Sequence, residues 1–505
     1  MAYTRKKKEI DPEFLRLPLE ALADAALDRA RGLGATYADF RLERSKGQVI
    51  TARDRELENL SNAETIGYCV RVIRKGSWGF AYGLELDPEP AAEVAAKAIS
   101  VATTFASLNQ RPVELAAEPV HRGTYISEYE VNPFDVPDGE KIDLVLSLND
   151  TLLSSAKVDR ADSYARQRLE NKFFANLDGS HITQQRIRVD AEIDALKIDE
   201  RSGEFQTMSS IAPAVGRGWE YLTDGYDYRR EAVELPAMLE EKLAASSVEP
   251  GRYDLVLDPK NLALTIHESI GHSTELDRVL GHEANYAGTS FATLDKLNTL
   301  HFGSAVMNVT GDRIAPHGLS TIGHDDEGVA AQSWDIIRDG VLVGYQLNRQ
   351  MAREVGFGRS NGCAFADGPS HVPLQRMPNV SLKPAEEDIT LNDLIGGVDR
   401  GIYIVGSGSW SIDMQRYNFQ FTGQRFYEIR GGKLGQQLKD VAYQSKTTDF
   451  WNSLEAVGGP STYVLAGTFG CGKGQPGQTA PVSHGSPAAL FRNVNVLNTA
   501  MEGST

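Results

Sequence analysis

The sequence predicts a two-domain α+β fold, in which an N-terminal α+β domain with an antiparallel sheet precedes a β-rich C-terminal domain. Three observations favour this class. The length of 505 residues exceeds what one hydrophobic core usually holds. Helical and strand-like segments occur in the first half without a regular βαβ alternation. The second half is rich in glycine, with turn signals about every 8 to 12 residues, which is typical of a sandwich or barrel-like core.

The N-terminal domain is predicted to span residues 1–235, in the order helix, strands, helix, helix, strands. Segments rich in alanine and leucine indicate helices, the first of which stops at a glycine. Alternating polar and apolar runs predict antiparallel strands over residues 36–83 and 163–220. Asp178 and Gly179 stand between two extended runs, which is a strong hairpin signal. The predicted helices cover residues 19–34, 89–106 and 139–157.

The C-terminal domain is predicted to span residues 236–505. A break at residues 223–237 precedes it, and a helix over residues 238–248 leads into it. Short strands with glycine-rich turns between them then predict the sandwich or barrel-like core.

One helix of the C-terminal domain carries a candidate metal motif. Residues 253–257 are predicted to form a strand. Asp258 followed by Pro259 predicts the start of a helix, because Asp caps helix N-termini and Pro favours the first helical position. The sequence HESIGH, residues 267–272, lies near the end of this helix. It is similar to the H-E-x-x-H motif of zinc peptidases, but it has one additional residue between the histidines.

The additional residue changes the geometry of the motif. Side chains five positions apart on a regular α-helix diverge by about 140°, so His267 and His272 would not bind one ion from such a helix. Two local geometries would bring them together. One is a π-helical turn, which rotates less per residue. The other is an end of the helix at Gly271 in the left-handed conformation. Both histidines can also be read as ordinary polar residues.

A third ligand is available later in the sequence. Catalytic zinc usually has three protein ligands and one open position. Cys471 stands between two glycines in residues 467–487, a segment predicted to be an irregular loop, and a thiolate is a good zinc ligand. The other two cysteines, Cys69 and Cys363, are interpreted as structural.

Composition limits the partners and the compartment. There are 52 Lys and Arg against 69 Asp and Glu, and the formal net charge of −17 disfavours general nucleic-acid binding. No run of about 18 apolar residues predicts a membrane span. The basic start of the sequence is not followed by the apolar segment of a signal peptide. Three cysteines do not form a disulfide framework. We therefore expect a cytoplasmic protein that binds neither nucleic acid nor membranes.

Three blocks of the sequence together resemble one protein family. They are HESIGHSTELD at residues 267–277, QRMPN at 375–379 and CGKGQPGQTAPVSHG at 471–485. Their order and spacing are similar to those of the TldD/PmbA family, and specifically of its TldD-like zinc metalloprotease subunit. The C-terminal half carries these motifs, and the N-terminal half matches mainly in its layout of helices and strands.

The resemblance implies a zinc ion held by His267, His272 and Cys471, with Glu268 as the catalytic residue. It also implies a two-domain α+β protein that cleaves small or unfolded peptides. Members of the family typically work as a heterodimer with a PmbA-like partner, TldE, that lacks the zinc motif; self-association is the alternative. An older family label, modulator of DNA gyrase, is interpreted as an indirect consequence of proteolysis.

The leading hypothesis is therefore a zinc peptidase that binds extended peptides along a sheet edge near Cys471. The alternatives are a non-catalytic PmbA-like binding or regulatory subunit and a zinc hydrolase of non-peptide amides. Three further residues have two interpretations each. Glu275 or Asp277 would orient a histidine ligand, or both are solvated acids. His484 would stabilise an oxyanion, or it is a plain loop histidine.

Overall fold

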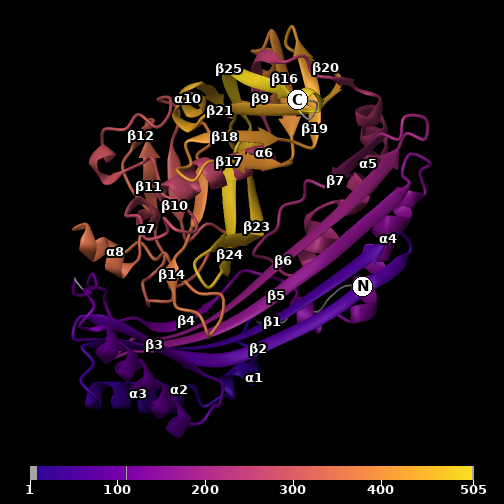
Figure 1. Ribbon diagram of the computed structural model, residues 1–505. Helices are drawn as coiled ribbons and strands as arrows, with labels where there is room; N and C mark the ends of the chain where they lie inside the picture. Colours follow the sequence, from indigo (N-terminus) through magenta and orange to yellow (C-terminus); the bar gives the residue numbers. More distant parts are fainter. Residues whose placement is uncertain (1–7, 110, 503–505) are drawn as a thin grey trace.

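The computed structural model describes residues 8–109 and 111–502, and it confirms the α+β class. Figure 1 shows a sheet of long strands from the first half of the chain, which runs beneath the sheets formed by the second half. The expectation of no signal peptide rests partly on residues 1–7, which lie outside the described residues. Within the described ranges, no helix combines the length and the apolar character needed to cross a membrane.

The first sheet has seven strands in the order β3-β2-β1-β5-β6-β4, with β7 paired to β6. All neighbours are antiparallel except β4 and β6, so the predicted antiparallel sheet is confirmed. The predicted hairpin at Asp178 and Gly179 joins β5 to β6. The strands are β1 (Tyr37–Arg53), β2 (Glu56–Arg74), β3 (Ser77–Gly83), β4 (Arg122–Ile126), β5 (Arg160–Asn176), β6 (His181–Ile198) and β7 (Phe205–Ser209).

Helices cover one face of this sheet, and the predicted helices are confirmed in position. Phe40 of β1 packs in the same cluster as α2 and α3, and Ile50 packs in the same cluster as α4 and α5. Because side chains alternate along a strand, Arg41 points to the other face. There it donates a hydrogen bond to Asp326 of the second region at 3.3 Å. The helices are α1 (Pro12–Leu15), α2 (Leu19–Gly32), α3 (Pro88–Phe105), α4 (Asp138–Leu153) and α5 (Tyr228–Ala244).

The break predicted at residues 223–237 is wrong, because α5 occupies most of it. Asp227 caps this helix by accepting a backbone N–H of the first turn at 2.9 Å. Pro236 lies inside the helix and removes one hydrogen bond from it. Buried side chains hold α5 against β6, β7 and β20, so packing overrides the local helix-breaking signals. The helix predicted at 238–248 therefore begins and ends earlier than expected.

The second region is built on a ten-stranded sheet in the order β17-β18-β21-β25-β9-β16-β19-β20-β8, with β22 paired to β25. Strand β9 lies inside it, antiparallel to β25 and parallel to β16. The domain boundary expected between residues 235 and 236 falls within α5 and stays a prediction. The strands are β8 (Ser246–Ser247), β9 (Gly251–Leu257), β16 (Arg400–Val405), β17 (Trp410–Ile412), β18 (Asn418–Thr422), β19 (Arg425–Arg430), β20 (Lys433–Lys439), β21 (Val441–Lys446), β22 (Leu454–Val457) and β25 (Ala489–Asn498).

Three smaller sheets complete the region, and two of them, the four-stranded sheet and the β23-β24 pair, share one hydrophobic core with the large sheet. One has the order β12-β11-β10-β15, and the pairs β13-β14 and β23-β24 form the others. Their strands are β10 (Val309–Asp312), β11 (Ser333–Arg338), β12 (Val341–Leu342), β13 (Ala364–Phe365), β14 (Leu374–Gln375), β15 (Asn379–Leu382), β23 (Val464–Lys473) and β24 (Gln478–Ser486). The helices are α6 (Pro259–Ile266), α7 (Leu276–Val279), α8 (Arg349–Glu354), α9 (Leu391–Gly396), α10 (Thr447–Asn452) and α11 (Thr499–Glu502). Short helical turns are η1 (Pro133–Asp135), η2 (Tyr221–Gly225), η3 (His267–Gly271), η4 (His272–Thr274), η5 (Leu294–Lys296) and η6 (Pro460–Thr462).

Candidate metal centre

Helix α6 begins where the sequence predicts. The carboxylate of Asp258 accepts the N–H groups of Asn261 at 2.9 Å and Lys260 at 3.3 Å, and Pro259 takes the first helical position. The strand before it, β9, is paired on both sides within the ten-stranded sheet. The helix is therefore anchored at its N-terminus to a paired strand, and the motif follows directly after its last residue.

The histidine spacing is accommodated by a π-helical turn. After α6 the backbone widens into η3, a π-helical turn that contains His267, and His272 follows as the first residue of the 3₁₀ turn η4. A π turn rotates less per residue than the roughly 100° of an α-helix. The two imidazole rings consequently face each other, with centroids 4.6 Å apart. Of the two geometries expected from the sequence, this is the first.

The left-handed alternative at Gly271 is wrong. Gly271 has a φ of −53°, within the right-handed helical region. The glycine serves a different purpose, since a Cβ at this position would lie 2.5 Å from the sulfur of Met377. The missing side chain lets the π turn pack closely against the segment that contains Met377.

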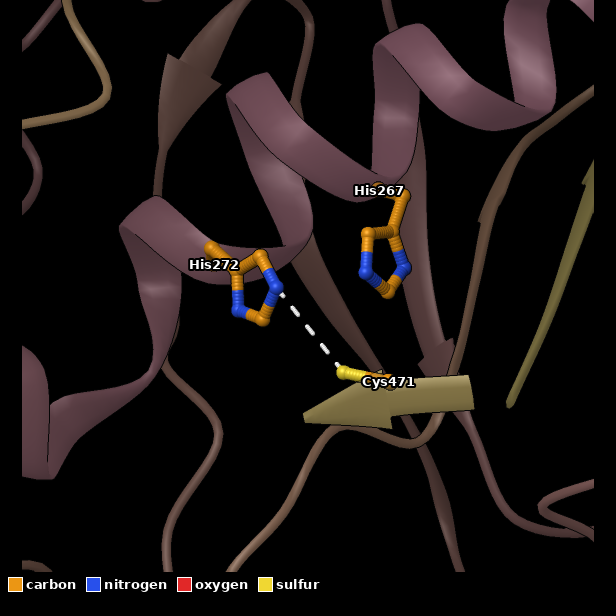
Figure 2. A group of neighbouring side chains, drawn as sticks. All are labelled: His267, His272 and Cys471. Atoms are coloured by element: carbon orange, nitrogen blue, oxygen red, sulfur yellow. Dashed lines mark hydrogen bonds between the residues drawn. The ribbon is translucent and has the colours of Figure 1, made fainter. Parts of the chain in front are cut away.

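Cys471 completes the group from a distant part of the chain. Figure 2 shows His267, His272 and Cys471 with their side chains directed toward one another, and their potential ligand atoms all lie within 4.8 Å. The Cys471 sulfur is 3.8 Å from Nε2 of His272. The predicted irregular loop is wrong, because Cys471 lies on β23, which is paired with β24. The pairing shifts register between Thr468 and Cys471, and this irregularity lies directly before the cysteine.

Hydrogen bonds fix the tautomer of His267. Nδ1 of His484 lies 2.9 Å from the carbonyl of Val380, which can only accept, so this nitrogen carries the proton. Nε2 of His484 is then an acceptor, and it receives the Nδ1–H of His267 at 2.7 Å. Burial lowers the pKa of His267 and takes that of His484 well below its ordinary value, which keeps both rings neutral. Nε2 of His267 is left with a free lone pair for a metal.

His272 is oriented in the same way by a carboxylate. Its Nδ1 donates to Glu275 at 2.8 Å, which leaves Nε2 as the ligand atom that faces Cys471. Lys473 donates to Glu275 at 3.2 Å and to Asp277 at 2.8 Å. Burial alone would raise the pKa of Glu275, but the charge of Lys473 and the hydrogen bond from His272 hold it well below its ordinary value. Glu275 therefore orients His272, and Asp277 fixes the lysine behind it.

The three cysteines differ in their electrostatic surroundings. Burial raises the pKa of Cys69 to about 11 and that of Cys363 to about 12, in agreement with a structural role. Burial would also raise the pKa of Cys471. The interaction with His272, together with the charge of Arg376, outweighs burial and lowers it. Cys471 is thus the cysteine whose surroundings favour the thiolate that a metal requires.

Two arginines belong to the site although the sequence predicted no role for either. Arg376, in the block QRMPN, donates to the backbone carbonyls of Cys471 and Gln478 and so ties β23 to β24. Arg416 donates from Nη1 to Oε2 of Glu268 at 2.6 Å. The motif QRMPN contains Arg376 and could have pointed to it, whereas no pattern in the sequence singles out Arg416.

The donor set fits zinc. Imidazole nitrogens and a thiolate are ligand types that zinc takes, and three protein ligands leave a fourth position open, as in catalytic zinc sites. Donors at zinc bond lengths lie roughly 3.3–3.8 Å apart in a tetrahedron. The 3.8 Å between Cys471 and His272 agrees with this spacing, and the widest separation in the group is 4.8 Å. His267, His272 and Cys471 would therefore hold the ion.

Replacing His484 by alanine should weaken zinc binding about 10- to 100-fold, the usual effect of losing a group that orients a ligand. The change leaves the Nδ1–H of His267 buried without its acceptor. Competition with a chelator of known affinity measures the effect. His301→Ala, at an exposed position, is the control. Equal zinc affinity in the two variants would contradict the orienting role of His484.

Models of three domains of one family match the chain in order. They are PmbA/TldA metallopeptidase domain 1 over residues 38–102, the central domain over 131–239 and the C-terminal domain over 250–498. A protein named metalloprotease from Methanothermobacter thermautotrophicus is 29% identical over 495 residues, which cover 97% of this chain and 100% of the relative. One named zinc metalloprotease TldD homolog, from Saccharolobus solfataricus, is 24% identical over 93% of this chain and 98% of its own length.

The fold also has solved counterparts. The crystal structure of TldE from Thermococcus kodakarensis superposes with a TM-score of 0.70 at 16% identity, over 93% of this chain and 98% of that one. The agreement covers both regions of the chain, so the whole architecture is shared. From the matched domain models and the relatives together, we conclude that the chain belongs to the PmbA/TldD family.

Proposed function

We propose that this protein is a zinc-dependent metallopeptidase that cleaves small or unfolded peptides in the cytoplasm, as the catalytic subunit of a complex with a PmbA/TldE-like partner. The observation that carries the proposal is the convergence of His267, His272 and Cys471 within 4.8 Å, with Glu268 adjacent in the chain to the first ligand. The names of the relatives, metalloprotease and zinc metalloprotease TldD homolog, support it.

Glu268 supplies the proton transfers of peptide hydrolysis. Zinc, when bound, lowers the pKa of a water molecule and polarises the scissile carbonyl. The carboxylate of Glu268 accepts the proton of the attacking water and later delivers it to the leaving amine. Burial alone would raise the pKa of Glu268, but electrostatic interactions with the neighbouring histidines and with Arg416 and Arg278 outweigh burial and lower it. The carboxylate is therefore ionised at neutral pH and able to accept a proton.

Strand β23 offers an edge on which a substrate could be held. Among the described residues β23 pairs with β24 alone, so its other edge carries backbone groups without a strand partner. Buried and exposed side chains alternate along it, and Cys471 is on the buried side. A peptide added beside this edge would be bound through backbone hydrogen bonds, with little dependence on its side chains. A folded domain has no free extended segment to offer.

A stably folded domain should resist the enzyme, whereas the same polypeptide, denatured and alkylated, should be cleaved at many sequences. A substrate must adopt an extended conformation to pair with the edge of β23, and a stably folded domain does not expose such a segment. Gel electrophoresis and mass spectrometry of the two digests measure the difference. Equal cleavage of the folded and the denatured form would contradict the proposed selection of extended substrates.

Zinc analysis combined with peptidase assays tests the proposed function. We expect one zinc per chain, cleavage of an unstructured peptide that stops after chelation and returns with zinc, and higher activity when a PmbA/TldE-like partner is added. The structural likeness to TldE supports the choice of partner. If the protein binds zinc but cleaves no peptide, with or without the partner, the result would favour a non-catalytic binding or regulatory subunit. Hydrolysis limited to non-peptide amides would favour a zinc hydrolase of such amides.

A further inference from the structure

Arg416 reaches the candidate general base from an unusual backbone conformation. It lies between β17 and β18 with a φ of 63°, in the left-handed region that favours glycine or asparagine. The carboxylate of Asp413 fixes the loop by accepting three of its backbone N–H groups. Thr447 Oγ1 donates to the carbonyl of Arg416 at 2.7 Å. The surrounding structure therefore maintains a strained arginine at this position.

The guanidinium of Arg416 has donors to spare. Within the described part of the chain, its one hydrogen bond is the 2.6 Å contact with Glu268, and its buried Nε has no partner. A guanidinium carries five N–H donors in a planar fork. The side chain is 16% exposed, so the guanidinium is not sealed from solvent. Because Glu268 directly follows His267 in the chain, this contact places Arg416 near one of the candidate ligands.

The other polar groups near the ligands are engaged or completely buried. Lys473 donates to Glu275, to Asp277 and to a backbone carbonyl. Arg376 donates to two backbone carbonyls and Arg278 donates to Glu275. Each of these arginines also has one nitrogen without a partner among the described residues, but both side chains are buried away from solvent. His484, which the sequence offered for oxyanion stabilisation, has one ring nitrogen on His267 and the other on a carbonyl. Among the described cations near the ligands, Arg416 is the one that has unpartnered N–H donors and is also accessible to solvent.

The charge that Arg416 faces moves during peptide hydrolysis. When water attacks the scissile carbon, its proton passes to Glu268, whose carboxylate becomes neutral. The π pair of the carbonyl becomes a lone pair on oxygen, which creates an oxyanion. When this intermediate collapses, the carbonyl re-forms, the C–N bond breaks with its electron pair going to nitrogen, and that nitrogen takes the proton from Glu268. Between these steps the negative charge lies on the substrate oxygen and no longer on Glu268.

We propose that Arg416 is a catalytic residue that donates a hydrogen bond to this oxyanion, after its guanidinium turns from Glu268 toward the substrate. A charged donor aimed at an oxygen that becomes negative in the reaction stabilises the transition state more than the ground state. The inference rests on the proposed peptidase function and adds the group that stabilises its intermediate. It also accounts for the strained backbone, since the position needs a long cationic side chain despite its left-handed conformation.

Arg416→Gly is the sharpest test, because glycine adopts the left-handed conformation without strain while alanine does not. We expect unchanged zinc content and a fall in kcat of about 10²- to 10³-fold, the usual effect of removing one oxyanion donor. Affinity for a phosphinic peptide, which imitates the tetrahedral anion, should fall by a similar factor in calorimetry. Affinity for the uncleaved peptide, measured in the Glu268→Gln background, should change little.

Two further variants make the result specific. Arg416→Lys keeps the charge but not the planar fork, so we expect a smaller loss of kcat than in Arg416→Gly. His317→Gly, at a residue with the same φ of 63°, controls for the change of backbone and should leave kcat unaffected. Unchanged affinity of Arg416→Gly for the phosphinic peptide, or a loss of zinc that accounts for its lost activity, would overturn the proposal. A wild-type protein that binds zinc but cleaves no peptide would overturn the proposed function, and this inference with it.

Discussion

Glu268→Gln is expected to abolish peptide cleavage while the zinc content stays at the wild-type level. The amide cannot accept the proton of the attacking water, and general-base catalysis contributes about 10²- to 10⁴-fold to the rate. The replacement has the same shape, and its amide oxygen can still accept the hydrogen bond from Arg416. His267, His272 and Cys471 are unchanged, so metal binding does not depend on the substitution. Cleavage rates and zinc analysis by mass spectrometry, on one preparation, measure both effects.

Glu283→Gln is the matched control for this variant. Glu283 also follows a histidine directly, yet it lies outside the metal group. Its replacement should leave both cleavage and zinc content unchanged. If Glu268→Gln cleaves peptides at the wild-type rate, Glu268 is not the general base.

Cys471→Ser is expected to remove most of the bound zinc and, with it, the peptidase activity. A neutral hydroxyl is a poor replacement for a thiolate. Interaction with His272 and the charge of Arg376 lower the pKa of Cys471 against the effect of burial. Groups that only orient a ligand change zinc affinity about 10- to 100-fold, so the loss of a ligand should exceed about 100-fold. The fold should survive, because β23 and β24 remain paired through their backbones. Zinc content after dialysis against a weak chelator and the thermal unfolding midpoint provide the measurements.

Cys363→Ser is the control for a buried cysteine outside the metal group. Burial raises the pKa of Cys363 to about 12, so it is a neutral thiol at physiological pH. Its replacement should change the unfolding midpoint but not the zinc content. Wild-type zinc content in Cys471→Ser would exclude Cys471 from the ligand set.

The parts of the fold that local signals determine were predictable from the sequence. Asp258 and Pro259 mark the start of α6, and the Asp178–Gly179 turn marks the β5–β6 hairpin, because each depends on the conformational preferences of adjacent residues. The motif residues were identified for a similar reason, because the sequence shows directly which residues can bind a metal and how far apart they stand. The sequence left the π turn and the left-handed end of the helix as two alternatives. Packing against Met377 accompanies the π turn, and a contact of that kind is not visible in the sequence.

Features that depend on distant contacts were not predictable. The glycines around Cys471 favour a loop, but β24 supplies the hydrogen bonds that make the segment a strand. Pro236 signals a break, yet packing on three strands keeps it inside α5. Arg416 stands 148 residues from Glu268 in a loop without any motif, so only the folded chain brings the two together.

The candidate metal ligands also lie far apart along the chain. Cys471 follows His272 by 199 residues, and His484 follows His267 by 217. At synthesis rates of roughly 5–20 residues per second, the HESIGH segment leaves the ribosome well before the β23–β24 hairpin exists. Contacts of such large separation close large loops and form late in folding. Zinc capture is therefore tied to the final stages of folding, and an enzyme that cuts unfolded chains would stay inert for as long as it is itself unfolded.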